Sequence, residues 1–288
     1  MRNSLSPLRY PGGKTCLVPF LSKVLELNDL AESEFVEPYA GSAAAAVHLL
    51  LGEYVDSIRI NDRDPHIYAF WYSLLHHTDK FCDLILKEPV TIDNWRKQRE
   101  IYSSYKRYGK LKVAFSTLFL NRCNRSGIIT SGGPIGGYAQ AGKWKIDVRF
   151  NRTELANRIR AISEFSDRIA ISNKDGLDFL CSVQRTKRKK LVFLDPPYVE
   201  KADRLYDSDF NEKKHEKLAA HLLGTATYPW VLTYDNAKLI RKLYRSRSPR
   251  KIVLNYAAQN KRQGTELLVR SRSLRSNFEY LPGGDKCF

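Results

Sequence analysis

The residues best suited to chemistry in this sequence stand together in LVFLDPPYVE, residues 191–200. An ionised Asp195 accepts hydrogen bonds, Tyr198 offers a ring that can stack on a ligand, and Pro196 and Pro197 fix the backbone between them. The four apolar residues before Asp195 predict a strand buried on both faces of a parallel sheet. Open α/β sheets bind ligands at the carboxyl ends of their strands, so the motif predicts a functional site. The alternative is that the two prolines only end a strand.

A second group of residues lies near the amino terminus, in RYPGGKT at residues 9–15. It predicts a tight turn that leads into the apolar helix CLVPFLSKVLEL, with Lys14 in the first helical turn. A cation at that position is unfavourable for the helix dipole. Lys14 is therefore expected to face an anion or a ligand.

A third group combines a glycine turn with a later acid. EFVEPYAGSAAAAVHLL predicts a strand, a turn and an alanine-rich helix, and Gly41, Ser42 and Ala43 let a ligand approach the helix amino end closely. Asp62 ends the next predicted strand about twenty residues later, the spacing at which nucleotide-binding folds place an acid on ribose hydroxyls. Alone, such a glycine turn more often serves packing than binding.

Seven short apolar segments are candidates for the strands that position these residues. They are residues 34–39, 57–62, 168–173, 191–195, 230–235, 251–256 and 266–270, and most are followed by a helical pattern. About a hundred residues separate the second from the third, too many for one crossover, so a second structural unit is expected there. Residues 66–120 have helical periodicity, and the glycine-rich residues 124–150 predict a β-hairpin or a long ordered loop.

Length and composition are those of a globular protein. A chain of 288 residues suffices for one large α/β domain with an insertion or for two modest domains. No apolar run is long enough for a membrane span and the first residues lack a secretory signal, so a cytoplasmic location is expected. The cysteines are odd in number and scattered, which supports neither a disulfide framework nor a zinc site.

The net charge of +17 points to a polyanionic partner. DNA or RNA gains affinity when lysine and arginine displace counterions from phosphates, whereas an anionic membrane is the weaker interpretation. The run KRYGKLK (106–112) lies in a helical stretch and is a candidate for gripping a phosphate backbone. RTKRKK (185–190) precedes the strand at 191–195, so it is expected at the opposite end from the site as a solvated loop.

RYPGGK, EPYAGS, IND and DPPY, in this order, resemble the Dam-type, alpha-class DNA adenine methyltransferases, and LFLNRCNRSGI and GPIGGY also have counterparts there. The resemblance covers about Leu8 to Leu268. DPPY with a glycine turn is moderately specific, and the full set in this order is strongly specific. Family members commonly have glycine at the position of Ala43 and often tryptophan at that of Tyr10.

The resemblance implies a doubly wound, Rossmann-like α/β sheet of seven strands with the last inserted antiparallel. Residues 1–65 and 166–288 would form the catalytic domain, and residues 66–165 a helical and β-hairpin insert that recognises the target DNA. S-adenosylmethionine is the implied cofactor, with no metal, and double-stranded DNA is the implied partner. We expect a monomer, and a cognate restriction endonuclease is a further partner that such an enzyme can have.

The resemblance also assigns roles to matching residues. The catalytic residues would be Asp195, Pro196, Pro197 and Tyr198. The cofactor-binding residues would be Tyr10, Lys14, Glu37, Pro38, Tyr39, Gly41 and Asp62, together with Asp195. Asp175 is a further candidate for contact with the cofactor or the adenine, although it can equally be an acid at a helix amino end. Arg122, Asn124, Arg125 and Ser126 are candidates for DNA contact, since Arg and Asn read base edges well. This stretch differs from the GATC-methylating members, so the target sequence is not carried over.

The chemistry explains why a strand should end in DPPY. The exocyclic amine of adenine is a poor nucleophile because its lone pair is delocalised into the ring. Asp195 and the carbonyl of Pro196 can accept both amine hydrogens and direct the lone pair toward the methyl group. Tyr198 can stack on the base, which must first be flipped out of the duplex.

Three other functions remain open from the sequence. An RNA or protein methyltransferase would share the cofactor half, although glutamine-modifying relatives tend to carry NPPY rather than DPPY. A catalytically inactive DNA-binding protein is the second, and intact Asp195 and Tyr198 count against it. The third is a phosphate-binding nucleotide enzyme, for which the glycine spacing of PGGKT is too short.

Overall fold

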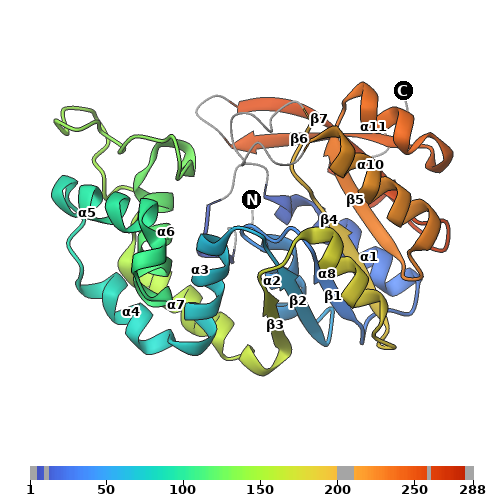
Figure 1. The fold of residues 1–288 in the computed structure, drawn as a ribbon, viewed down its shortest axis with the longest axis horizontal. Helices are drawn as coiled ribbons and strands as arrows, with labels where there is room; N and C mark the ends of the chain where they lie inside the picture. Colours follow the sequence, from blue (N-terminus) through green and yellow to red (C-terminus); the bar gives the residue numbers. More distant parts are fainter. Residues whose placement is uncertain (1–4, 10–12, 200–210, 258–260, 283–288) are drawn as a thin grey trace.

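The computed structural model describes residues 5–9, 13–199, 211–257 and 261–282, and its centre is one seven-stranded β-sheet (Figure 1). The strands follow the order β3-β2-β1-β4-β5-β7-β6. They are β1 (Glu34–Glu37), β2 (Ser57–Asn61), β3 (Ile169–Ser172), β4 (Lys190–Leu194), β5 (Trp230–Asp235), β6 (Arg250–Ala257) and β7 (Lys261–Arg270). All seven strands predicted from the sequence are therefore present.

The sheet has the predicted doubly wound, Rossmann-like topology. Strands β1 to β5 pair in parallel, and β7 lies antiparallel between β5 and β6. The strand order reverses at β1, which pairs with β2 on one side and with β4 on the other. In such sheets the crevice outside the carboxyl ends of the strands at this reversal is the usual ligand site. The chain that follows β1 and the chain that follows β4 meet there.

Helices cover both faces of the sheet because successive strand residues point to opposite sides. Phe35 packs in the core with α1 (Val18–Leu27) and α2 (Ala44–Leu51), whereas its neighbour Val36 packs in the core with α8 (Gly176–Gln184), α10 (Glu212–Ala220) and α11 (Lys238–Leu243). All four residues of β1 and all five of β4 are buried. A short 3-10 helix, η1 (Lys14–Leu17), precedes α1.

The hundred residues between β2 and β3 form a helical insert beyond the β3 edge of the sheet (Figure 1). Its helices are α3 (Pro65–His76), α4 (Thr78–Lys87), α5 (Ile92–Ser103), α6 (Lys110–Cys123) and α7 (Arg152–Ser163). The predicted helical character of residues 66–120 is confirmed. The insert does not have a separate core, since Trp71 of α3 and Phe119 of α6 belong to the same buried cluster as Phe35.

The β-hairpin predicted within the insert is not formed, and the alternative of a long ordered loop holds. Between α6 and α7 the sheet-like contact is a single bridge from Asn124 to Pro134. Gly136 and Gly137 both have positive φ. The side chain of Gln140 forms hydrogen bonds with backbone groups that would otherwise pair two strands of a hairpin. Its amide nitrogen donates to the carbonyls of Ile135 and Gly137, and its oxygen accepts from the Ile146 amide. Local side-chain bonds thus replace strand pairing.

Within the described part of the chain, no helix combines the length and the apolar character that a bilayer crossing requires.

Candidate active site

Asp195 lies directly after the buried strand β4, at the carboxyl edge of the sheet, as predicted. Its carboxylate is held by three side chains from different elements. Lys14 Nζ lies 2.7 Å from Oδ2, Thr233 Oγ1 of β5 donates to Oδ1 at 2.9 Å, and the Tyr198 hydroxyl lies 3.1 Å from Oδ1. The Asp195 side chain retains 25% exposure. It is therefore oriented by the protein and still open to a ligand.

Lys14 supplies the positive charge of this site. Its side chain is 4% exposed, and its ammonium donates to Asp195 and, at 2.9 Å, to the Tyr198 hydroxyl. The prediction that Lys14 faces an anion is confirmed, and the anion is a carboxylate of the protein. Tyr10, the other residue of this motif assigned to cofactor binding, lies outside the described residues.

Glu266 is a further member of the site and was not foreseen from the sequence. The Tyr198 hydroxyl donates to Glu266 Oε1 at 2.5 Å, and Lys14 Nζ lies 3.6 Å from the same atom. Glu266 stands near the middle of β7 and pairs with Asp235, the last residue of β5. Because β7 runs antiparallel, this residue lies at the sheet edge where the parallel strands end. No motif marks Glu266, so only the antiparallel insertion reveals it.

Asp235 holds the chain that leaves the DPPY motif. Its Oδ1 accepts a hydrogen bond from the Val199 amide at 3.2 Å, and its side chain is buried. The sequence showed the strand that ends at Asp235 but not this contact. The contact fixes the direction of the backbone immediately after Tyr198.

The structure brings the glycine turn and Asp62 together, as the spacing predicted. Gly41 has φ of 48°, and its amide donates to Asp62 Oδ2 at 2.8 Å, while the Asp64 amide donates to Oδ1 at 2.9 Å. Burial, and then the charge of Asp64, raise the pKa of Asp62 to about 7. Ala43, where relatives commonly have glycine, also has a left-handed φ of 44°, which costs an L-residue about 1–2 kcal/mol.

Glu37 and Pro38 lie at the end of β1 and support the same turn. Glu37 is buried, and its Oε1 accepts a hydrogen bond from the Ala46 amide in the first turn of α2 at 3.0 Å. The pKa of Glu37 is raised to about 8, mainly by burial; the hydrogen bond from Ala46 opposes the rise, the Asp195 charge adds to it and the Lys14 charge opposes it. The Pro38 carbonyl accepts from the side-chain amide of Asn61 at 3.0 Å. In this structure the hydrogen bonds of Glu37 and Pro38 therefore stabilise the turn that follows β1.

Asp175 caps α8, which is the structural alternative left open by the sequence. Its Oδ1 accepts a hydrogen bond from the Leu177 amide at 2.9 Å. The next residue, Gly176, packs against the ring of Tyr39, where an added Cβ would come within 2.5 Å of ring atoms. Burial and the nearby Asp175 carboxylate raise the pKa of Tyr39. Asp175 therefore borders the turn that follows β1.

The residues predicted to contact DNA have different surroundings. Asn124 is fully buried, and its amide accepts from Trp95 Nε1 at 2.7 Å and donates to the Ile128 and Ile129 carbonyls. Its polar groups hold the loop together, so in this structure Asn124 supports the loop and is not exposed to read a base, unlike the expectation from the sequence. Arg122 is also turned inward, where its guanidinium donates to the Pro7 carbonyl.

Arg125 and Ser126 remain accessible. The Arg125 side chain is exposed, and its guanidinium lies beside Gly137 of the long loop. Ser126 is partly exposed and has a left-handed φ of 56°, which turns the chain sharply between the two neighbours. For Arg122, burial followed by the charges of nearby arginines lowers the pKa to about 9. Among the predicted DNA contacts, Arg125 is thus the cation best placed to meet a ligand.

Asn121 is another residue that the sequence analysis missed. Its side chain brackets Arg9, accepting from the Arg9 amide at 2.7 Å and donating to the Arg9 carbonyl at 2.6 Å. It also donates to the Gly127 carbonyl at 3.0 Å. Its position inside LFLNRCNRSGI was visible, but its partner lies more than a hundred residues away. Asn121 ties the segment before Lys14 to the insert.

KRYGKLK lies in the helical setting expected for it, whereas RTKRKK is only in part the expected solvated loop, since residues 187–189 are exposed and Lys190 is buried. KRYGKLK spans the connection into α6, where Lys110 Nζ lies 4.7 Å from the centre of the Tyr72 ring in a surface pocket of about 480 Å³. RTKRKK precedes β4. There Arg188 pairs with Asp56, and Lys190 is buried and donates to carbonyls at the end of α8.

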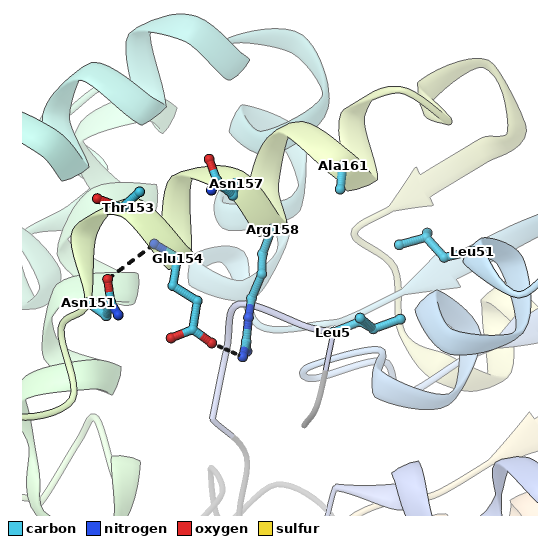
Figure 2. A pocket seen from close by; sticks show the side chains of 8 residues that line it. All are labelled: Leu5, Leu51, Asn151, Thr153, Glu154, Asn157, Arg158 and Ala161. Carbon is cyan, nitrogen blue, oxygen red and sulfur yellow. Dashed lines mark hydrogen bonds and ion pairs between the residues drawn. The ribbon is translucent and has the colours of Figure 1, made fainter. Parts of the chain in front are cut away.

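A separate surface pocket of about 490 Å³ lies along α7 (Figure 2). Figure 2 shows Glu154 joined to Arg158 on this helix, with Leu5 and Leu51 on the opposite wall. Arg158 also donates to the Ser6 carbonyl. None of the predicted site residues lines this pocket, so it is distinct from the cluster around Asp195.

Comparison with known proteins identifies the family. The model of the D12 class N6 adenine-specific DNA methyltransferases matches residues 10–259. The chain belongs to this family. This methyltransferase is therefore an enzyme that modifies adenine in DNA. Its predicted Dam-type identity and its predicted enzyme class are confirmed.

Other comparisons add little to the family assignment. No curated protein matches the sequence of this methyltransferase. Among solved structures it is similar to the rRNA methyltransferase aviRa from Streptomyces viridochromogenes, with 14% identity, 92% of this chain and 86% of that chain covered, and a TM-score of 0.40.

Proposed function

We propose that this methyltransferase moves a methyl group from S-adenosylmethionine to the exocyclic amine of an adenine that is flipped out of duplex DNA. One observation carries the proposal: Asp195, oriented by Lys14, Thr233 and Tyr198, stands at the carboxyl edge where the strand order reverses. An acceptor is therefore held at the position where doubly wound sheets bind ligands.

The residues around the glycine turn suit S-adenosylmethionine. Each carboxylate oxygen of Asp62 accepts one backbone amide and keeps a lone pair for a hydroxyl donor. Gly41, Glu37, Pro38 and Tyr39 would form the wall beside it. When bound, the cofactor supplies an electrophilic methyl group on a sulfonium. Lys14 and Asp195 would then lie between the cofactor turn and the adenine.

Asp195 would act as a fixed acceptor. Its Oδ1 is aimed by Thr233, and Pro196, which is buried, holds the backbone that carries the second acceptor carbonyl. Hydrogen bonds from the adenine amine to these oxygens keep its lone pair directed at the methyl group. Tyr198, partly exposed, would stack on the extruded base.

The helical insert, residues 66–165, would recognise the target. Arg125 is an exposed cation beside the long loop of the insert, and the run at 106–112 would contact phosphates. A monomer suffices for this proposal, because Lys14, Asp195, Asp62 and the insert all come from one chain. Sedimentation with and without DNA measures the oligomeric state.

The test is to incubate the enzyme with unmethylated duplex DNA and methyl-labelled S-adenosylmethionine, digest the DNA, and identify the labelled nucleoside. We expect label in N6-methyladenine and a loss of at least about a thousandfold for Asp195→Ala, since removing key polar groups at the reacting atom costs this much in other enzymes. Label on RNA but not on DNA would contradict the substrate. Undiminished transfer by Asp195→Ala would contradict the role of Asp195.

A further inference from the structure

Two carboxylates share one ammonium beneath the adenine site. Lys14 Nζ lies 2.7 Å from Asp195 and 3.6 Å from Glu266, and the Tyr198 hydroxyl touches all three groups. Lys14 and Glu266 are almost fully buried, with side-chain exposures of 4% and 2%, whereas Asp195 is 25% exposed. Glu266 is therefore the inner carboxylate of the pair and Asp195 the outer one.

This arrangement bears directly on the proposed role of Asp195. In the structure Oδ2 of Asp195 accepts from Lys14, while Oδ1 accepts from Thr233 and lies near Tyr198. An adenine amine that donates to Oδ2 would share this oxygen with Lys14 and weaken the hold of Asp195 on the ammonium. If Lys14 yields its place on Asp195, its buried ammonium needs another carboxylate, because an unpaired buried charge is strongly unfavourable.

We propose that Glu266 is a positioning residue for methyl transfer, an inference that rests on the function proposed above. It retains the Lys14 ammonium when the adenine amine occupies Asp195, and it holds the Tyr198 hydroxyl so that the ring keeps one orientation. Glu266 does not touch the substrate. It acts through Lys14 and Tyr198, and the geometry requires only that Lys14 close a gap that is 3.6 Å in the present state.

The position of Glu266 suits this task. It lies in the interior of the sheet, paired with Asp235 on β5 and with Ile252 on β6, so its backbone is fixed on both sides. Tyr198 is held from the other direction by Asp235, which binds the next backbone amide. Glu266 is thus a fixed acceptor beside the Lys14 ammonium. It keeps this charge paired both when Lys14 contacts Asp195 and when the adenine amine takes that place.

The test compares Glu266→Gln with the wild type, which must first transfer methyl groups to adenine. Gln keeps an acceptor for the Tyr198 hydroxyl and removes the charge. We expect kcat to fall roughly tenfold to a hundredfold, as when other electrostatic stabilisation is removed from active sites. The dissociation constants for S-adenosylmethionine and DNA should stay within about threefold. A purely structural role would lower thermal stability and leave kcat of the folded enzyme unchanged.

Glu34→Gln is the matched control. Glu34 is also a buried strand glutamate in an ion pair, with Arg59, but it begins β1 at the opposite edge of the sheet. Its replacement should leave kcat unchanged. If Glu266→Gln does not fold, Glu266→Asp keeps the charge and shortens the reach to Lys14, and a smaller loss of kcat is expected.

A double-mutant cycle identifies the path of the effect. In a Lys14→Met background, measured by single-turnover transfer of labelled methyl groups, Glu266→Gln should cost less than about twofold. A kcat of Glu266→Gln within about twofold of the wild type would overturn the proposal, and so would equal losses in both backgrounds. A wild type that transfers no methyl to DNA would refute the proposed function itself, before any variant is compared.

Discussion

At the scale of single residues, burial decides which polar side chains can meet a ligand. Asn124 and Arg125 are neighbours in sequence, but the first is fully buried and bonded on both sides of its amide, and the second is exposed. The same contrast separates Glu266 from Asp195. In each pair one side chain is buried, and the other is exposed enough for a ligand to reach it.

Replacing Asn124 should affect stability, and replacing Arg125 should affect target choice. Asn124→Ala removes the partner of the buried Trp95 donor and of the Ile128 carbonyl, so we expect a loss of about 2 kcal/mol or more in unfolding free energy. Arg125→Ala should leave the unfolding free energy within about 0.5 kcal/mol of the wild type. It should weaken or relax the preference for the target DNA sequence. Thermal melts and sequencing of methylated sites measure the two effects. Unchanged preference in Arg125→Ala would refute its role in recognition.

Glu37 should make the stability of the cofactor-free enzyme depend on pH. Its pKa in the folded state, about 8, lies above the ordinary value of 4.5. The folded protein therefore holds a proton that the unfolded chain has lost, and this contribution is complete below pH 4.5 and lost as the pH rises through 8. The side chain in Glu37→Gln stays neutral at every pH. The unfolding free energy of this variant, relative to that of the wild type, should therefore rise by at least about 1 kcal/mol between pH 5 and pH 8.5. If the stability difference between Glu37→Gln and the wild type, measured by thermal melts, is the same at pH 5 and pH 8.5, the raised pKa of Glu37 is contradicted.

At the scale of elements, the direction and ends of helices and strands place charge. The first turn of α6 carries Lys110 and Lys112, both exposed and without an acid in that turn, which is unfavourable for the helix dipole unless an anion is near. β7 brings Glu266 to the edge of the sheet that holds Asp195, because it runs antiparallel to both of its neighbours. In both cases the orientation of the element, and not the residue type alone, indicates the role.

The two basic runs should differ in their effect on DNA binding. Lys110→Ala with Lys112→Ala should lower the slope of log affinity against log salt by about 1 for each phosphate that the variant no longer neutralises. Lys187→Ala with Lys189→Ala removes the same charge from the exposed loop before β4 and is the control. Fluorescence anisotropy over a salt series measures both. Equal slopes for the two double variants would show that only net charge matters.

At the scale of the whole molecule, the insert and the sheet share one core. The buried cluster runs from Phe35 in β1 through Trp71 in α3 to Ile159 in α7, and the Trp71 indole donates to the Gly41 carbonyl at 3.1 Å. The glycine turn is thus bonded directly to the first helix of the insert. If the insert recognises the target, as we propose, this bond links it to the turn proposed to bind the cofactor.

This shared core predicts that the enzyme unfolds in one step. We expect a single calorimetric transition whose calorimetric and van't Hoff enthalpies agree, because neither part buries its apolar surface alone. A chain without residues 66–165 should then fail to fold. Two separate transitions, or a stable catalytic part without the insert, would show that residues 66–165 form an independent domain.

Much of this molecule follows from short-range sequence patterns. Runs of apolar residues predicted all seven strands, and they predicted that Asp195 and Asp62 would each stand at the end of a strand. The unfavourable place of Lys14 in its helix predicted an anionic partner. These inferences hold because strand burial, turn chemistry and helix dipoles act within a few residues. The local sequence is therefore sufficient to predict them.

Other features depend on contacts between distant segments, which only the tertiary structure decides. Glu266 joins the site through antiparallel pairing, Asn121 holds Arg9 from more than a hundred residues away, and Asn124 is buried by Trp95. The glycine-rich loop could pair as a hairpin by its pattern, yet Gln140 satisfies its backbone instead. The sequence thus determined the fold class and the place of Asp195, the residue proposed to be catalytic, at the end of β4. Packing determined the inner partners, because burial and charge pairing depend on which surfaces come together.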